Sequence, residues 1–362
     1  LTSEDSSDYR VHKVPSTPGV QDEAVVRGII EVLEENSIRP EEVGLIVHGT
    51  TAATNAMLER KGASVVLVTT AGFEDVIEIG RQNRDDIYDL YASKTEPLVP
   101  RDHRIGIAER VGASGVVLKS LDEDEIKRLL EAVRKVDSDS VAVSLLFSFL
   151  NSAHERAVAK SLEQLGRYTV CSSDVLPEFR EYERTTATVL EGYLGPLVIS
   201  YLQRLQASTE RICPNARLAV MQSNGGTMLV SKAKGNAVSL ALSGLAGGVI
   251  GGWEVSQRAG LADVITLDMG GTSCDISALS GRVRVRADNE VAGLPLRTPS
   301  VDVKTIGAGG GSIAWTDDLG VLHVGPQSAG ARPGPASYGY GGENATVTDA
   351  NLALGRLSAS DF

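Results

Sequence analysis

Aromatic residues are scarce in this sequence, at 4% of its 362 residues, whereas glycine occurs 38 times. Any core must therefore be built from Val, Leu, Ile and Ala, and an apolar content of 42% is enough for two packed domains. We do not expect a disordered chain. The many glycines predict many tight backbone turns, as is typical of α/β nucleotide enzymes.

Cysteine is also rare. The three cysteines, an odd number, are Cys171, Cys213 and Cys274, and no two of them form a C-x-x-C pair. This pattern indicates neither a disulfide framework nor a zinc knuckle. A reducing, cytoplasmic compartment is the expectation.

The sequence also has few basic residues relative to acidic ones and no long apolar run. Lys and Arg number 35 against 47 Asp and Glu, for a net charge of -12, which argues against binding to nucleic acid or to an acidic membrane. The longest apolar candidate, residues 240–253, is broken by Ser243 and five glycines, so we expect no membrane span.

Apolar runs alternate with segments of helical period, which predicts an α/β protein. Expected strands lie at residues 9–14, 43–48, 64–69, 140–149, 168–172 and 217–222, and expected helices at 23–35, 122–136, 153–165, 181–206 and 244–258. The helix at 181–206 is expected to kink at Gly195-Pro196. Beyond residue 301 glycine and proline dominate and the periodicity is weak.

Residues 264–279 form the segment richest in chemistry, because polar groups crowd around a predicted strand, turn and strand. Glycines let backbone N–H groups approach a phosphate, hydroxyls can donate to its oxygens, and a carboxylate can hold Mg²⁺ through water. The residues concerned are Asp268, Gly270, Gly271, Thr272, Ser273 and Asp275, with Asp268 as the magnesium residue. A plain β-hairpin with a Gly-Gly turn is the alternative, and a Walker A loop is excluded because no Gly-Lys-Ser/Thr follows.

The pattern Asp-x-Gly-Gly-Thr-x-x-Asp at 268–275 resembles the phosphate motif of the actin, sugar kinase and chaperone ATPase superfamily. More specifically, it is similar to the second phosphate motif of the hydantoinase A, 5-oxoprolinase and acetone carboxylase beta subunit family. Further segments resemble the family in the same order, at 48–62, 69–73, 79–84, 178–184, 221–226, 301–312 and 325–330.

This resemblance implies an actin-like (ribonuclease H-like) ATPase fold with two lobes and mixed sheets flanked by helices. It implies an N-terminal hydantoinase/oxoprolinase-type domain at 1–176 and a hydantoinase A-type domain at 177–362. The family's first phosphate hairpin and its C-terminal adenosine segment have no counterpart here, so we expect a fold truncated at both ends that binds ATP poorly by itself.

His48, Thr50, Thr51 and Asn55 could converge at the carboxyl edge of a strand, where sites form in α/β proteins. Helix capping by either threonine, with His48 merely packed, is the alternative. The family resemblance favours a catalytic role for these residues.

Arg81, Asn83 and Arg84 combine guanidinium and amide groups suited to a carboxylate or a carbonyl oxygen. Ion pairs with Asp85 and Asp86 in a solvated loop are the alternative reading.

Gly309, Gly310 and Gly311 are expected in a loop that offers a nest of N–H groups to an anion. Asp302, just before this loop, is a candidate partner for a metal or a water, or an ordinary turn carboxylate.

The resemblance implies an enzyme that uses ATP and Mg²⁺ to phosphorylate the carbonyl oxygen of a small cyclic amide such as hydantoin, N-methylhydantoin or 5-oxoproline, and then hydrolyses it. It also implies a hydantoinase B-type partner subunit and a homo- and hetero-oligomer. A ketone carboxylase subunit and a non-catalytic ATP-binding or partner-binding module are the alternatives.

Overall fold

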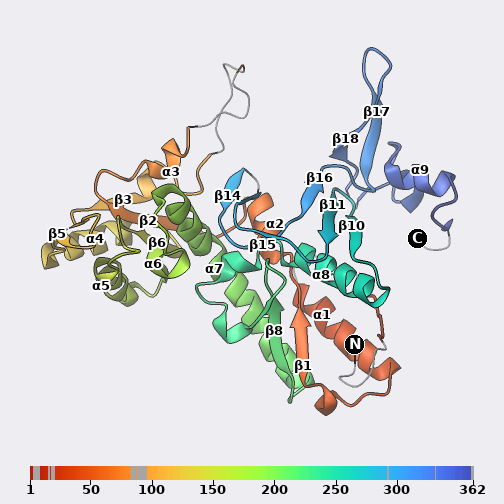
Figure 1. Cartoon of the computed structure of the whole chain (residues 1–362), viewed down its shortest axis with the longest axis horizontal. Helices are drawn as coiled ribbons and strands as arrows, with labels where there is room; N and C mark the ends of the chain where they lie inside the picture. Colours follow the sequence, from red (N-terminus) through yellow and green to blue (C-terminus); the bar gives the residue numbers. More distant parts are fainter. Residues whose placement is uncertain are drawn as a thin grey trace. The chain divides into compact units, whose positions relative to one another are not determined.

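The computed structural model describes residues 1–2, 9–14, 17, 21–82, 88, 96–291, 293–330 and 332–359. Two compact units divide the chain (Figure 1). The first unit comprises Leu1–Gly244 and Arg286–Ser300, and the second comprises Leu245–Val285 and Val301–Phe362.

The first unit carries most of the helices. They are α1 (Gln21–Glu35), α2 (Ala52–Leu58), α3 (Val76–Ile79), α4 (Glu123–Lys135), α5 (Ala153–Leu162), α6 (Ser172–Val175) and α7 (Glu181–Ile212). Its strands are β1 (Leu45–His48), β2 (Val65–Thr70), β3 (Arg104–Ile107), β4 (Arg110–Val111), β5 (Val117–Lys119), β6 (Ser140–Ser144), β7 (Tyr168–Cys171), β8 (Arg217–Met221), β9 (Thr227–Leu229), β13 (Asn289–Val291) and β14 (Leu294–Leu296).

The main sheet of this unit is parallel, with strand order β3-β2-β6-β7. Every residue of β2 and β6 is buried, because helices cover both faces. Val65 and Leu67 join the core that contains α7, while Val66 and Val68 join the core formed with α4 and α5. The period-two alternation of a strand therefore supplies both cores at once.

Helix α7 runs six residues beyond its predicted end at 206 and keeps Pro196 inside it. Its buried Glu191 accepts hydrogen bonds from the Tyr168 hydroxyl at 2.9 Å and from the N–H groups of Ala237 and Val238 at 3.0 and 2.9 Å. Burial raises the pKa of Glu191. These bonds tie α7 to β7 and to the turn of helix at Ala237–Leu240.

Two predicted strands need correction. Among the described residues, 9–14 pair only through an isolated bridge between Tyr9 and Thr2, and an extended segment without a longer ladder is not a strand. The strand predicted to reach residue 149 ends at Ser144, because the N–H of Leu145 donates to the buried Glu155 carboxylate instead of to a neighbouring strand.

The second unit contains an antiparallel sheet of order β10-β11-β16 and the hairpin β17–β18. Helix α8 packs on this sheet through Ala246 and Val249, which meet Leu279 and Val301. The bounds are α8 (Ser243–Arg258), β10 (Asp263–Met269), β11 (Cys274–Ser280), β16 (Lys304–Ile306), β17 (Ser312–Thr316), β18 (Leu322–Ser328) and α9 (Val347–Ala353), while β12 (Val285–Arg286) and β15 (Ser300–Val301) lie where the chain passes between units.

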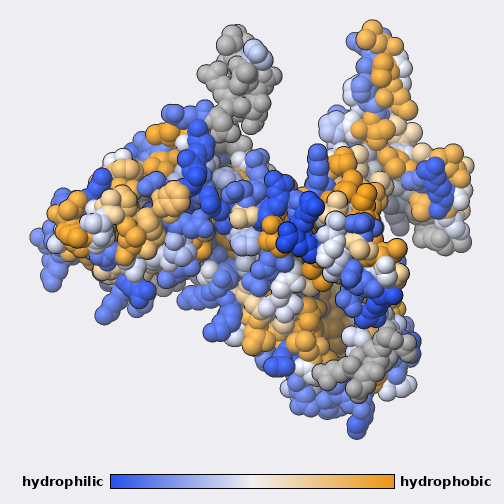
Figure 2. Space-filling view, viewed as in Figure 1, coloured by the Kyte–Doolittle hydropathy of each residue, from blue (hydrophilic) through white to orange (hydrophobic). Residues whose placement is uncertain are grey.

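Hairpin β17–β18 is a structure that the weak periodicity beyond residue 301 did not predict. Its apolar residues, such as Trp315 and Leu322, are largely exposed, and Figure 2 shows apolar surface along this arm. A strand without a buried face leaves no alternating pattern in the sequence.

Within the described ranges, no helix combines the length and apolarity that crossing a membrane requires.

Candidate functional site

The predicted phosphate-type turn is a β-hairpin, as expected from the sequence. Strands β10 and β11 pair from Asp263 opposite Ser280 to Met269 opposite Cys274, and the N–H of Gly270 donates to the carbonyl of Ser273 at 2.9 Å to close the turn. The four turn residues 270–273 project beyond the last paired residues.

Asp268 and Asp275 lie directly opposite each other in this hairpin. Residues in such a pair share one face of the sheet, and like charges placed there repel each other. The Asp275 carboxylate accepts a 2.6 Å hydrogen bond from the hydroxyl of Thr305, whereas Asp268 receives none from the described residues. This carboxylate pair suits an oxygen-seeking cation, which would relieve the repulsion.

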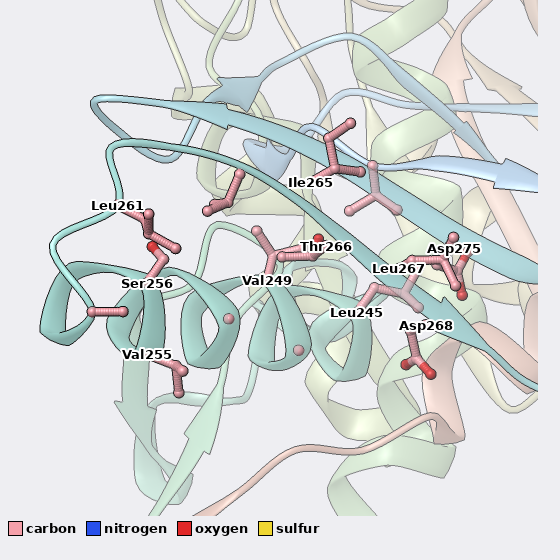
Figure 3. A pocket seen from close by; sticks show the side chains of 15 residues that line it. Leu245, Val249, Val255, Ser256, Leu261, Ile265, Thr266, Leu267, Asp268 and Asp275 are labelled. Atoms are coloured by element: carbon pink, nitrogen blue, oxygen red, sulfur yellow. The ribbon is translucent and has the colours of Figure 1, made fainter.

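Both carboxylates line one end of a cavity of about 510 Å³ between α8 and β10 (Figure 3). Figure 3 shows Asp268 and Asp275 at one end, with Leu261 at the other. Most of the remaining wall is made of apolar side chains, including Leu245 and Val249. The polar end of the cavity is thus the end next to the glycine turn.

The backbone at the turn is open to an acceptor. The N–H groups of Thr272 and Ser273 donate to no described residue. Gly309 lies over them, and a Cβ added to Gly309 would stand 2.6 Å from both nitrogens. Only glycine at position 309 lets the loop approach the turn this closely, because any side chain there would meet these two nitrogens.

The predicted anion nest in the triglycine loop itself is wrong for this structure. The N–H groups of Gly310 and Gly311 donate to the carbonyls of Gly270 and Gly271 at 2.8 and 2.7 Å, and that of Gly309 donates to the Ser312 hydroxyl at 2.8 Å. The residues just before this loop, 304–306, form β16. The three glycines support the hairpin turn and have no N–H left for a ligand.

His48 ends β1, and its Nε2 lies 2.8 Å from the Tyr201 hydroxyl of α7. Burial lowers the pKa of His48 to about 4. The imidazole is therefore neutral near pH 7, and burial also raises the pKa of its partner Tyr201. A neutral imidazole can orient a ligand through a hydrogen bond but holds no positive charge for it.

The two threonines after His48 sit in different environments. Thr50 is buried, exchanges hydrogen bonds with Ser243 at 2.9 and 3.4 Å, and accepts the N–H of Ala52 at 3.1 Å. Thr51 is exposed and precedes α2 without a capping hydrogen bond, and its hydroxyl accepts a 3.4 Å contact from the Asn55 amide. The described contacts thus link Thr51 to Asn55 in the first turn of α2, whereas Tyr201 holds His48 and Ser243 holds Thr50.

Arg81 forms a bidentate ion pair with Glu183 of α7, at 2.6–2.8 Å. Glu183 is 12% exposed and Arg81 48%, so the guanidinium still reaches solvent on one side. Asn83 and Arg84, and the neighbouring Asp85 and Asp86, lie outside the described residues.

Asp302 lies between β15 and β16. Its N–H donates to the carbonyl of Arg284 at 2.9 Å, and its own carbonyl accepts the Ser277 hydroxyl at 2.8 Å. The backbone at Asp302 is therefore fixed against the sheet that carries the hairpin.

Two family models match successive parts of the chain. Residues 184–362 match the family model described as Hydantoinase/oxoprolinase, and residues 1–166 match the Hydantoinase/oxoprolinase N-terminal region. The chain belongs to the hydantoinase/oxoprolinase family.

Several members of the hydantoinase/oxoprolinase family are similar along nearly the whole chain. The caprolactamase subunit alpha of Pseudomonas jessenii is 38% identical over 99% of this chain and 53% of its own length. The 5-oxoprolinase of Saccharomyces cerevisiae is 35% identical over 93% of this chain and 28% of its own length. The chain spans about half the length of these relatives, or less.

Two solved structures share the mixed α/β fold. The ATP-dependent caprolactamase from Pseudomonas jessenii superposes with a TM-score of 0.84 at 36% identity, covering 99% of this chain and 53% of that one. The nucleotide-free structure of acetone carboxylase superposes with a TM-score of 0.80 at 28% identity, covering 96% of this chain and 52% of that one.

The sequence did not predict the residues that position the candidate site residues His48, Thr50 and Arg81. Tyr201, Ser243 and Glu183 hold His48, Thr50 and Arg81, from 153, 193 and 102 residues away. None of the three stands in a local pattern that points to its partner, so only the fold could find them.

Proposed function

We propose that this chain is part of an ATP-dependent hydrolase subunit that opens a small cyclic amide, of the hydantoin, N-methylhydantoin or 5-oxoproline kind. The observation that carries the proposal is the hairpin, where Asp268 and Asp275 face each other beside a turn in which three N–H groups, those of residues 271–273, donate to no described residue. The hydantoinase/oxoprolinase relatives with ATP-dependent or lactam-opening names support it.

The residues present fit a phosphate and Mg²⁺. Gly271, Thr272 and Ser273 would meet phosphate oxygens through N–H and hydroxyl groups that donate to no described residue, and Gly270 would shape the turn that presents them. Asp268 would hold Mg²⁺ through water, with Asp275 nearby. When bound, ATP supplies the phosphoryl group that makes the amide carbonyl a better electrophile.

The substrate side is proposed in the first unit. Neutral His48 would orient the ring through a hydrogen bond, with Thr50, Thr51 and Asn55 shaping the same connection. Arg81 would meet a carbonyl or carboxylate oxygen, since its outer face reaches solvent. We propose Asn83 and Arg84 as its companions and Asp302 as a water or metal partner.

The wider assembly follows from the same family. We propose the actin-like two-lobed fold, family-type domains at 1–176 and 177–362, a cytoplasmic location and a homo- and hetero-oligomer. The name of the caprolactamase subunit alpha points to a partner subunit, and we propose a hydantoinase B-type one. The likeness to acetone carboxylase favours ketone carboxylation as the second candidate.

The test is ATP turnover by the full-length protein with its partner subunit, measured across hydantoins, 5-oxoproline, other lactams and ketones. We expect turnover to rise with one cyclic amide and the ring to open. A rise with ketones and bicarbonate alone would select the carboxylase, and no dependence on any of them would reject both.

A further inference from the structure

The surroundings of His48 decide which of its two ring nitrogens carries the proton. A neutral imidazole has one N–H donor and one bare nitrogen acceptor, and the hydrogen bond made by one nitrogen sets the role of the other. Burial lowers the pKa of His48 to about 4, so the ring is neutral near pH 7. Its two tautomers would meet a ligand in opposite ways, one as a donor and the other as a base.

The core of the first unit holds the imidazole in place. His48 ends β1, and its backbone pairs with Val220 of the parallel strand β8. Its ring lies against that of Tyr201, with centroids 5.8 Å apart, and Tyr201 is buried in the cluster that packs α7 against this sheet. An imidazole turned over by 180° would place a carbon against the Tyr201 hydroxyl and lose their 2.8 Å hydrogen bond.

Nε2 is the acceptor of this hydrogen bond. A phenol, whose usual pKa is about 10, gives up its proton more readily than a neutral imidazole N–H does, so Tyr201 is the donor. Thr50 favours the same direction, because its hydroxyl also hydrogen-bonds the Tyr201 oxygen while accepting the N–H of Ala52 at 3.1 Å. Burial raises the pKa of Tyr201, and the bond from Thr50 offsets part of this rise, as a donated hydrogen bond does.

Nδ1 therefore carries the proton and is free to donate. It has no hydrogen-bond partner among the described residues, and it is not one of the side-chain atoms that those residues seal from solvent. Donation runs from Thr50 to Tyr201 to Nε2, which leaves Nδ1–H as the open end. An N–H donor recognises an oxygen, such as the carbonyl oxygen of an amide, and cannot take a proton from a nitrogen.

We propose that Tyr201 and Thr50 are positioning residues that hold His48 as its Nδ1–H tautomer, so that His48 meets its ligand as a neutral donor to an oxygen and not as a base. That this oxygen is a carbonyl of a small cyclic amide rests on the proposed function. The consequence is that His48 orients the ring without gaining or losing a proton, and that the ring N–H finds its acceptor in another residue.

The tautomer can be read directly by nitrogen NMR of the full chain with isotope-labelled histidine, near pH 7 and without ATP or substrate. The shifts of the two ring nitrogens report which one carries the proton, and the signals of His48 are assigned by their loss in His48→Gln. We expect the Nδ1–H form in the parent. Tyr201→Phe removes the donor to Nε2, so we expect the Nε2–H form to appear.

Tyr193→Phe on the same helix is the matched control, because the buried Tyr193 hydroxyl has no partner among the described residues. It should leave both the His48 tautomer and ATP turnover unchanged. Thr50→Ser keeps the hydroxyl and should keep the tautomer, whereas Thr50→Val should allow both forms. Circular dichroism checks that each variant folds.

The functional readout is amide-stimulated ATP turnover by the full-length protein with its partner subunit. Tyr201→Phe should lower kcat by about ten- to hundredfold, because a misplaced proton removes the donor that His48 offers. An Nε2–H or charged ring in the parent, an unchanged tautomer in Tyr201→Phe, or normal turnover in Tyr201→Phe would overturn the assignment. Failure of the proposed function looks different: the tautomer would respond to Tyr201→Phe as expected, yet no cyclic amide would stimulate turnover.

Discussion

Gly309→Ala should destabilise the second unit, because position 309 has no room for a methyl group. The new Cβ would stand 2.6 Å from the nitrogens of Thr272 and Ser273 and 2.7 Å from the carbonyl oxygen of Gly270. All three atoms are backbone, so no flexible side chain can move aside. The loop must withdraw from the hairpin turn.

The cost can be estimated from the contacts at risk. Overpacking costs about 1–3 kcal/mol, and each neutral hydrogen bond contributes about 1 kcal/mol. Withdrawal threatens the bonds from Gly310 and Gly311 to Gly270 and Gly271. We expect the free energy of unfolding to fall by about 2–4 kcal/mol.

Guanidinium denaturation followed by tryptophan fluorescence is the suitable assay, because the only two tryptophans, Trp253 and Trp315, both lie in the second unit. Gly307→Ala is the control, since no atom lies within 4 Å of its added Cβ, and it should change stability by less than about 0.5 kcal/mol. Equal effects of the two alanines would refute the proposed packing of loop on turn.

Two further predictions concern the first unit and can be followed by circular dichroism. Burial lowers the pKa of His48 to about 4, so as the pH falls below about 6.5 the unfolded chain binds a proton that the folded chain does not. Between pH 7 and pH 4.5 the free energy of unfolding should therefore fall by about 2–3 kcal/mol more in the parent than in His48→Gln. An equal fall in both proteins would contradict a neutral imidazole at this position. Ser243→Ala removes the 2.9 Å hydrogen bond to the buried Thr50 carbonyl and should lower the free energy of unfolding by about 1–2 kcal/mol. Ser161→Ala, which removes an exposed hydrogen bond to a carbonyl, is the control and should change it little. Equal effects of the two substitutions would count against the contribution of the Ser243 contact.

The hairpin could be predicted from the sequence because its signals are local. Two apolar strands flank a Gly-Gly turn, and the pairing of Asp268 with Asp275 follows from the length of that turn. Strand β2 and the start of β6 were equally clear, since their short apolar runs are buried on both faces, although the predicted end of β6 was wrong.

What the sequence could not predict depends on distant partners. The N–H groups of Gly310 and Gly311 donate to carbonyls of a turn 40 residues earlier, and no local sequence pattern predicts this contact. Arg81 has acidic neighbours in the sequence, yet its described partner is Glu183 on α7. A long-range contact is decided by the tertiary fold, and a local motif limits only the type of group that takes part.

The most direct measurement is ATP turnover in Asp268→Asn, made in the full-length protein with its partner subunit and the activating cyclic amide. The amide keeps the shape of the side chain but loses the charge that favours Mg²⁺. We expect turnover to fall by about two orders of magnitude or more, in line with roughly 3 kcal/mol for one lost electrostatic contact.

Asp263→Asn, at the other end of the same strand, is the control and should keep near-parental turnover. The melting temperature of both variants should move little, because Asp268 is exposed and receives no hydrogen bond from the described residues. A hundredfold loss confined to Asp268→Asn is the predicted result. Turnover near that of the parent would contradict the account and leave the hairpin with a structural role only.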